Sequence, residues 1–163
     1  MLYKGIQSYL AELKDYDLRA HAGTIQTMIM DEIAEAKAAS SFCGDHYSRQ
    51  IIHQINDFDI VIIGWQPGQM SPIHDHPTNG CIVYPICGTL SEWRYDEKLN
   101  QIAACKLSSP DYTYIDNGIC IHKLGNEDPS ENAISVHIYS PCNYQATIYP
   151  LTESKKLSTE ILP

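Results

Sequence analysis

The sequence predicts a mainly β fold, a barrel or a sandwich, preceded by a helical N-terminal part. Three observations support this prediction. Apolar residues recur at helical spacing only within about the first forty residues. After Cys43 short β-rich runs follow one another, separated by turn residues. No long helical pattern separates these runs, so a parallel sheet with crossover helices is disfavoured.

Two helical segments are expected in the N-terminal part. Ile6, Tyr9, Leu10 and Leu13 follow the i, i+3, i+4, i+7 spacing of one helix face. In the second segment, GTIQTMIMDEIAEAKAAS, isoleucines recur at every fourth position. Both patterns are typical of amphipathic helices that pack one face against a core.

Short strands are expected over the rest of the chain. The β-rich runs are RQIIHQI, FDIVIIGW, GCIVYPIC, TLSEWRY, DYTYI, AISVHIYS and YQATIYP. No linker is long enough to divide the chain, and no internal repeat is visible. We therefore expect one domain over residues 1–163, with a helical part at about 1–42 and a barrel at about 43–150.

Composition and charge exclude several classes of protein. The net charge is −9 and the sequence has no cluster of Lys and Arg, so a nucleic-acid partner is not expected. The segment MLYKGIQSYLAELKD lacks an apolar signal core, and no apolar run is long enough to span a membrane. We expect a cytoplasmic monomer without a membrane partner, whose six cysteines are mostly free and buried.

The stretch SPIHDHPTNGC, residues 71–81, places two histidines two positions apart, just after an apolar run. Because side chains alternate across a strand, His74 and His76 are expected on one face and Asp75 on the other. Two imidazoles on one face can converge on a metal. Asp75 is expected outside the ligand set, which argues against a site of two histidines and one carboxylate. A polar turn with surface histidines is the alternative interpretation.

His122, within CIHKLGN, is a third candidate ligand because it lies in a short predicted strand between apolar neighbours. Three histidines leave coordination positions open, as a catalytic metal requires. His21, His46 and His53 fit this pattern less well, and we do not expect them to be ligands.

Two sets of spaced residues resemble the two motifs of the cupin barrel. They are Gly68, five residues, His74-x-His76, four residues, Cys81, six residues, Gly88, and then His122, three residues, Asn126, with Gly118 before it. Most cupins have glutamate where Cys81 stands, and a cysteine there resembles the cysteine dioxygenase family. YSRQ, GWQPGQMSPIHDHPTNGC, HKLGN and AISVHIYSP resemble that family in the same order, over roughly residues 45–145.

The resemblance implies a cupin fold and a mononuclear Fe2+ ion held by His74, His76 and His122. Three neutral imidazoles leave the site at +2, with positions for a thiol and for dioxygen. The metal lowers the pKa of a bound thiol, and both oxygen atoms can end on sulfur as a sulfinate. The implied activity is the oxidation of L-cysteine to cysteine sulfinate with O2, a step of cysteine catabolism.

The resemblance also implies the residues around the substrate. Arg49 of YSRQ matches the arginine that binds the substrate carboxylate, and a guanidinium fork suits a carboxylate. Tyr139 matches the active-site tyrosine, which can bond to the carboxylate or to oxygen. Ser135, His137 and Tyr139 match a Ser-His-Tyr relay, and strand alternation independently places these three residues on one face.

Cys81 matches the family cysteine that forms a thioether bond with the active-site tyrosine, here Tyr139. Such a cross-link would hold the phenol beside the iron and change its acidity. The alternative interpretation is a buried, unreactive thiol.

Two other functions stay open at the level of sequence. A related thiol dioxygenase acts on 3-mercaptopropionate, and relatives of that type carry glutamine at the position of Arg49. Gln50 lies beside Arg49, and a register slip of one residue would exchange the two faces. A non-catalytic cupin that binds a small ligand or stores metal is the other alternative. Such a protein would not need Arg49, His137, Tyr139 and Cys81 together.

Overall fold

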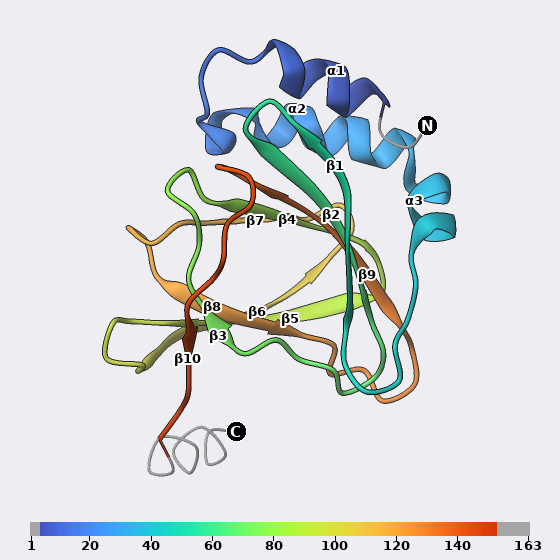
Figure 1. Cartoon of the computed structure of the whole chain (residues 1–163). Coiled ribbons are helices and arrows are strands. Elements are labelled where there is room, and N and C mark those ends of the chain that lie inside the picture. Colours follow the sequence, from blue (N-terminus) through green and yellow to red (C-terminus); the bar gives the residue numbers. More distant parts are fainter. Residues whose placement is uncertain (1–3, 153–163) are drawn as a thin grey trace.

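Helices cover one side of a β-barrel in the computed structural model, which describes residues 4–152. The helices are α1 (Lys4–Glu12), α2 (Leu18–Asp31) and α3 (Ile33–Ala39), and Figure 1 shows them beside the strands. The two predicted helical segments are confirmed, but the second is split because the backbone leaves helical geometry at Glu32, with ψ at 23°. The two ends of the expected domain, residues 1–3 and 153–163, lie outside the described residues.

The strands of the described residues form two five-stranded antiparallel sheets. The sheet next to the helices, called the covered sheet, has the order β1-β2-β9-β4-β7, with β1 (Ser48–Ile55), β2 (Phe58–Trp65), β9 (Ala133–Tyr139), β4 (Cys81–Cys87) and β7 (Thr113–Ile115). The second sheet has the order β10-β3-β8-β5-β6, with β10 (Ile148–Tyr149), β3 (Ile73–His74), β8 (Ile121–Gly125), β5 (Thr89–Tyr95) and β6 (Gln101–Ser108). The predicted mainly β class with N-terminal helices is therefore confirmed.

One strand was absent from the sequence-based prediction. β6 is the edge strand of the second sheet, and its first six residues are exposed. A strand with so little burial shows no apolar alternation, so its pattern resembles a loop. The predicted run YQATIYP contains only the two strand residues of β10.

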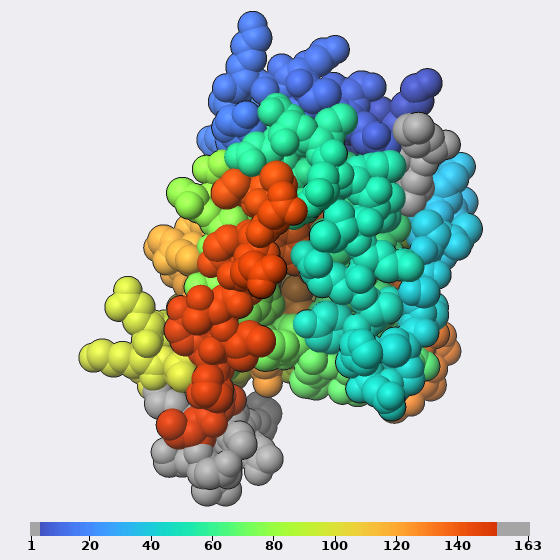
Figure 2. Space-filling view, in the orientation of Figure 1, coloured from blue at the N-terminus to red at the C-terminus, as the bar shows by residue number. Residues whose placement is uncertain are grey.

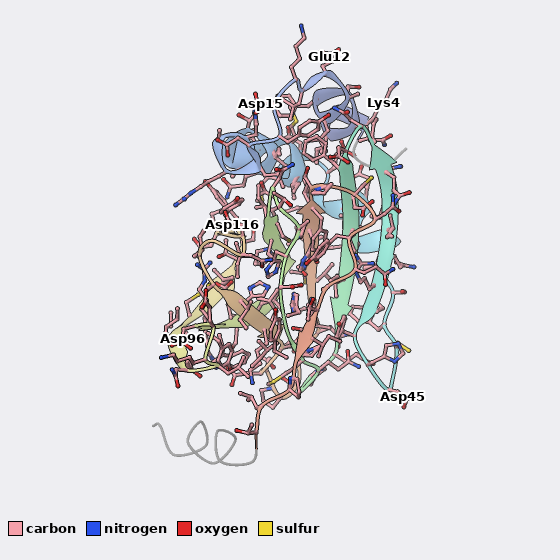
Figure 3. The ribbon with its side chains drawn as sticks, turned by 60° about the vertical axis from the view of Figure 1, so that its left-hand side comes forward. Lys4, Glu12, Asp15, Asp45, Asp96 and Asp116 are labelled. Carbon is pink, nitrogen blue, oxygen red and sulfur yellow. The ribbon has the colours of Figure 1, made fainter. Side chains whose placement is uncertain are left out.

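The covered sheet separates two apolar cores. On its outer face Ile60 and Ile62 pack with Ile25 and Ile29 of α2. Its inner face contributes Val61, Ile63 and Trp65 to a second cluster inside the barrel. All eight residues of β2 are buried, as a strand with both faces covered requires. Figure 3 shows charged residues such as Lys4, Glu12 and Asp45 at the outside of the molecule, away from both cores.

Two glycines hold the ends of β4. Gly80 and Gly88 have φ values of +84° and +68°, which residues with a side chain rarely adopt. A Cβ at Gly80 would lie 2.7 Å from the carbonyl oxygen of Ile115, and one at Gly88 would lie 2.6 Å from that of Asn132. Glycine is therefore required at both turns, which bring β4 into the barrel.

The remaining motif residues tie loops together. Asn126 is fully buried, and its Nδ2 donates to the carbonyl oxygens of Trp65 and Glu131. The backbone N–H of Gly68 donates to the carbonyl oxygen of Asn126 at 2.8 Å. The two motifs of the sequence thus meet through a backbone hydrogen bond.

The cysteines and the helices can be compared with their expected properties. All six cysteines lie within the described residues and are free, as expected. Only Cys81 and Cys120 are buried, however, and Cys105 is exposed because it lies on the edge strand β6.

None of the helices in residues 4–152 has the length and apolar character needed to cross a membrane.

Candidate metal centre and cavity

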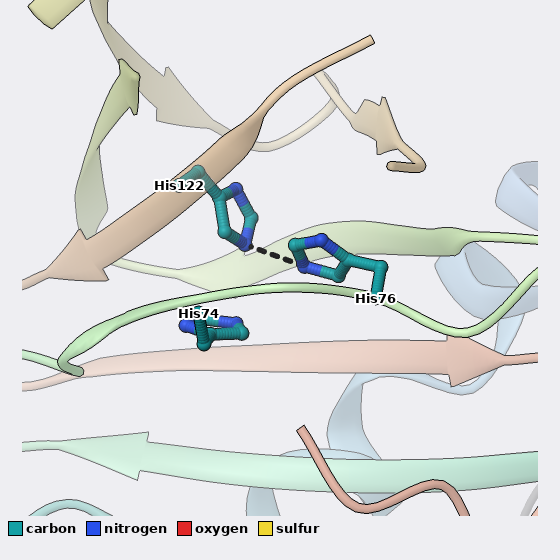
Figure 4. Close-up of side chains that lie close together, drawn as sticks. All are labelled: His74, His76 and His122. Atoms are coloured by element: carbon teal, nitrogen blue, oxygen red, sulfur yellow. Dashed lines mark hydrogen bonds between the residues drawn. The ribbon is translucent and has the colours of Figure 1, made fainter. Parts of the chain in front are cut away.

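Three histidines from distant parts of the sequence meet inside the barrel. One ring nitrogen each of His74, His76 and His122 lies within 4.8 Å of the other two. The Nε2 atoms of His76 and His122 are 3.0 Å apart, and the dashed line in Figure 4 marks this contact. The described residues contain no second group of three or more His, Cys, Asp or Glu side chains in such an arrangement. His21, His46 and His53 are therefore not part of it.

Each ligand candidate is held by a different element. His74 of β3 lies directly opposite His122 of β8 in the antiparallel pair. β3 ends at His74, so His76 lies beyond the strand. Its backbone N–H donates to Oδ1 of Asn117 at 2.9 Å, which positions the loop. We expected both histidines to point to one face because they alternate along one strand. This reason is wrong, because only His74 belongs to a strand, but the two rings do converge.

Hydrogen bonds determine which nitrogen of two rings is bare. Nδ1 of His74 lies 2.9 Å from the carbonyl oxygen of Pro72, and Nδ1 of His122 lies 2.7 Å from Oε1 of Glu92. Since both partners accept, each Nδ1 carries the proton and each Nε2 keeps its lone pair. Nδ1 of His76 is buried and has no hydrogen-bond partner within residues 4–152. The donor chemistry of the three rings therefore fits a divalent metal ion.

Burial keeps these imidazoles neutral. It lowers the pKa of His76 and of His122 well below the ordinary value of 6.5, and the neighbouring rings lower both further. The pKa of His74 is also lowered, chiefly by burial. Neutral rings can bind a metal near pH 7 without first releasing a proton.

A cavity of about 290 Å³ lies beside His74, and Arg49 lines its wall. β1 pairs Arg49 with Ile63, which belongs to the core inside the barrel, and Gln50 with Ile62, which packs toward the helices. Directly opposed residues of an antiparallel pair share a face, so Arg49 faces the cavity and Gln50 faces away. Among the described residues, the ion pairs do not include Arg49.

Four side chains form a hydrogen-bonded row that ends in the cavity. Nε1 of Trp65 donates to Oγ of Ser135 at 2.9 Å, and Oγ of Ser135 lies 2.8 Å from Nε2 of His137. Nδ1 of His137 lies 3.2 Å from the hydroxyl of Tyr139. Burial, followed by the charge of Arg49, lowers the pKa of His137 to about 3, so its ring is neutral. The structure thus brings together the predicted Ser-His-Tyr residues.

Cys81 and Tyr139 are direct neighbours across β4 and β9. The thiol is buried in the core inside the barrel, and it interacts with the Tyr139 side chain. Burial raises the pKa of the thiol, and it raises the pKa of the Tyr139 hydroxyl well above 10. Both groups therefore keep their protons near neutral pH. Arg49 also approaches this pair, with its guanidinium carbon 5.6 Å from the centre of the Tyr139 ring.

The C-terminal part of the described chain closes one wall of the cavity. The orange-red segment in Figure 2 crosses the face of the molecule beside β1, and Tyr144, Gln145 and Ala146 line the cavity. Asp75 holds this segment, because its Oδ1 accepts from the hydroxyl of Tyr144 at 2.8 Å and from the N–H of Thr147 at 2.6 Å. Asp75 thus binds the C-terminal segment and is not part of the group of three histidines.

Sequence reasoning did not identify four residues of the site, namely Tyr47, Trp65, Glu92 and Tyr144. Tyr47 and Trp65 line the cavity and stack with ring centres 4.7 Å apart. Alternation from Arg49 and from Val61 could have placed both of them on inner faces. Glu92 could have been found as a charge at an inward position of TLSEWRY. Tyr144 gave no local signal.

Solved structures share this fold. An uncharacterized conserved protein with a double-stranded beta-helix domain from Klebsiella pneumoniae superposes with a TM-score of 0.58 at 20% identity, covering 71% of this chain and 95% of that chain. A structure of oxalate oxidase superposes with a TM-score of 0.56 at 13% identity, covering 76% of this chain and 69% of its own. The fold and the site together define a cupin barrel with a three-histidine candidate metal centre.

The family model of cysteine dioxygenase type I matches residues 13–150, and the chain belongs to this family. Cysteine dioxygenase type 1 of Rattus norvegicus is 31% identical over 115 residues, which cover 66% of this chain and 58% of the rat protein. The Homo sapiens protein is 32% identical over 102 residues, which cover 58% of this chain and 51% of the human protein. The chain thus matches little more than half of the length of these curated relatives.

Proposed function

We propose that this chain is an iron-dependent dioxygenase that oxidises L-cysteine to cysteine sulfinate with O2. The observation that carries the proposal is that one cavity is lined by His74 of the three-histidine centre and by Arg49, which has no ion pair with a carboxylate among the described residues. In the balanced reaction, one thiol and one O2 give one sulfinate and one proton. We also propose that the chain works as one cupin domain and as a cytoplasmic monomer, as expected from its sequence.

The three histidines support the metal part of the proposal. His74, His76 and His122 would hold the ion, because neutral imidazoles of this kind suit several divalent metals. Membership of the family, rather than the donor set, supports the proposal of Fe2+ among those metals. An Fe2+ ion at this place would supply open positions at which a thiolate and dioxygen are activated together.

Arg49 supports a thiol that carries a carboxylate as the substrate. Its guanidinium faces the cavity and lacks a carboxylate partner among the described residues, so a substrate carboxylate can form the bidentate contact. Gln50 faces the helices. Both L-cysteine and 3-mercaptopropionate carry a carboxylate, so the proposal of L-cysteine rests on the family resemblance, in which relatives acting on 3-mercaptopropionate have glutamine at the cavity position that Arg49 holds here. A bound carboxylate would orient the thiol of the same molecule toward the histidines.

The row of hydrogen bonds supports a role for Tyr139 as a donor. An indole N–H can only donate, so Trp65 occupies one lone pair of the Ser135 oxygen. In the proposal the Ser135 hydroxyl donates to Nε2 of His137, and Nδ1–H of His137 donates to the oxygen of Tyr139. The Tyr139 hydroxyl would then keep its own proton for a bond to the substrate carboxylate or to oxygen.

The proposal can be tested by measuring oxygen uptake. Protein loaded with Fe2+ under anaerobic conditions should consume O2 faster with L-cysteine than with 3-mercaptopropionate or cysteamine. With 18O2, mass spectrometry should find two labelled oxygen atoms in the sulfinate. Faster use of 3-mercaptopropionate would favour the alternative substrate. A protein that binds Fe2+ but consumes no O2 with any thiol would be a non-catalytic cupin.

The metal site can be tested with single substitutions. His74→Ala, His76→Ala and His122→Ala should each strip iron and abolish activity, because a three-ligand site tolerates little loss. His46→Ala, which changes an exposed histidine outside the group, should keep iron and activity near the wild-type level. Iron content, measured by elemental analysis, near the wild-type value in one of the three variants would remove that histidine from the ligand set.

A further inference from the structure

Glu92 of β5 is a buried carboxylate that none of the roles above explains. Its side chain is 1% exposed, and a charge so deeply buried is unfavourable unless it is paired and hydrogen-bonded. Oε1 lies 2.7 Å from Nδ1 of His122. Oε2 lies 3.2 Å from Nε of Arg94 and accepts from the hydroxyl of Thr113 at 3.1 Å. Both oxygens of Glu92 are thus engaged, and one of them holds a candidate metal ligand.

The groups behind Glu92 are themselves fixed. Nη2 of Arg94 donates to Oγ1 of Thr113 at 2.6 Å and to the carbonyl oxygen of Tyr114 at 3.0 Å. Arg94 balances the charge of Glu92, so the pair as a whole adds no net charge to the metal centre. The carboxylate can therefore orient the His122 ring without weakening the attraction of the site for an anionic substrate.

The three histidines differ in what holds their outer nitrogen. His74 donates to a neutral carbonyl group, and His122 donates to a carboxylate. Nδ1 of His76 has no partner in the part of the chain that the structure describes. A carboxylate partner fixes the tautomer of a metal-binding histidine and makes its other nitrogen a stronger donor. His122 is the only ring of the three with such a partner among the described residues.

We propose that Glu92 is a positioning residue for the metal centre. Held by Arg94 and Thr113, it fixes His122 in the tautomer whose Nε2 is bare and makes this ring the strongest of the three donors. The inference rests on the metal site of the proposed function but not on the dioxygenase reaction. Glu92 acts through His122 and does not touch the substrate.

The test uses two variants of Glu92 and one matched control. Glu92→Gln replaces the carboxylate by an amide, which can donate to a ring nitrogen as well as accept. Glu92→Asp keeps a charge for Arg94 but is one methylene shorter, so it should not reach His122. Glu127→Gln is the control, because Glu127 is exposed and accepts from Ser91, the neighbour of Glu92.

Two readouts do not depend on catalysis. In metal-free wild-type protein, 15N NMR of the rings should show His122 protonated at Nδ1 only, whereas Glu92→Gln should show both tautomers. The affinity for Co2+, followed by visible absorption, should fall about ten- to a hundredfold in both Glu92 variants. The control should stay within twofold of wild type, and circular dichroism should show that each variant is folded.

Several results would overturn the inference. A wild-type His122 protonated at Nε2 would do so whatever the variants show. Co2+ affinity within twofold of wild type in Glu92→Asp would mean that the charge beside Arg94, not the contact with His122, is what matters. A wild-type protein that binds Co2+ as expected, but whose Fe2+ form consumes no O2 with thiols, would refute the dioxygenase proposal and leave the role of Glu92 intact.

Discussion

Arg49 and Gln50 are adjacent in the sequence but face opposite sides of β1. The pairing with β2 directs Arg49 into the cavity and Gln50 toward the helices. A guanidinium in the cavity can bind a carboxylate through two parallel hydrogen bonds, whereas an amide offers neither the charge nor the fork. One step of strand register therefore decides whether an arginine or a glutamine lines the cavity.

Arg49→Gln should weaken the use of L-cysteine by about 30- to 150-fold in kcat/KM, because losing one charge-assisted fork costs on the order of 2 to 3 kcal/mol. Cysteamine, which lacks a carboxylate, should lose far less. Initial rates of O2 uptake measure both effects. Gln50→Ala is the matched control and should behave like the wild type. An equal loss for both thiols would show that Arg49 does not recognise the carboxylate.

Cys81 and Tyr139 are placed for the thioether bond that the family resemblance implies, since they oppose each other across two strands. The bond would form with loss of two hydrogen atoms, and iron with dioxygen can take up the two electrons. We predict a mixture in which the protein is partly cross-linked as made and becomes more so during turnover. Peptide mapping after turnover measures this, and recovery of Cys81 as an alkylatable thiol in every molecule would contradict it.

Single substitutions can distinguish the contributions of Cys81 and Tyr139 to activity. Cys81→Ala should still oxidise cysteine, but more slowly, because the cross-link only holds Tyr139 in place. Tyr139→Phe should lose more activity, since it removes the hydroxyl at the end of the hydrogen-bonded row. Rates of O2 uptake under identical iron loading compare the two variants. A larger loss in Cys81→Ala would reverse the proposed order of importance.

At the scale of elements, the short strands β3 and β10 close the cavity. β10 pairs with β3 so that Ile148 lies opposite His74 and Tyr149 opposite Ile73. Asp75 adds side-chain contacts to Tyr144 and Thr147 in the segment before β10. Such a short ladder gives little support by itself, so the carboxylate of Asp75 is expected to keep the segment in place.

Asp75→Ala should loosen residues 144–149, because it removes the acceptor for the Tyr144 hydroxyl and for the Thr147 N–H. Hydrogen exchange in this segment should become faster, and KM for cysteine should rise with the loss of the cavity wall. Asp111→Ala, in an exposed loop, is the control. Unchanged exchange at 144–149, with iron content near that of the wild type, would show that β10 alone holds the segment.

At the scale of the whole molecule, the barrel buries several imidazoles. Burial lowers the pKa of His76 and of His122 well below 6.5 and that of His137 to about 3. The unfolded chain, with ordinary values near 6.5, therefore binds more protons than the folded protein in the range below. The stability due to these neutral rings is fully present above about pH 6.5 and is lost as the pH falls toward about 3.

The urea concentration at which half of the metal-free protein is unfolded should therefore decrease as the pH is lowered from 7.5 to 4.5. His137→Gln should show a shallower decline, because the variant has one proton fewer to take up on unfolding. His46→Ala, which changes an exposed histidine, should follow the wild-type slope. A midpoint that does not change over this range would contradict the prediction.

Local patterns in the sequence were enough for the fold class and for much of the candidate site. Alternation places Ser135, His137 and Tyr139 on one face of a strand, and the spacing of His74 and His76 marks a metal-binding motif. These patterns extend over a few residues, where backbone geometry dictates the direction of each side chain. The helices followed their apolar periodicity for the same reason.

Only the tertiary structure decided which distant residues complete the site. The strand register turned Arg49 rather than Gln50 into the cavity, and the contact of Glu92 with His122 joins residues 30 positions apart. The edge strand β6 and the partner of Asp75 were equally hidden. Periodicity records whether a residue is buried, but it carries no information on the neighbour that packs against it. That neighbour is selected by the pairing of strands and by the need to satisfy each buried charge.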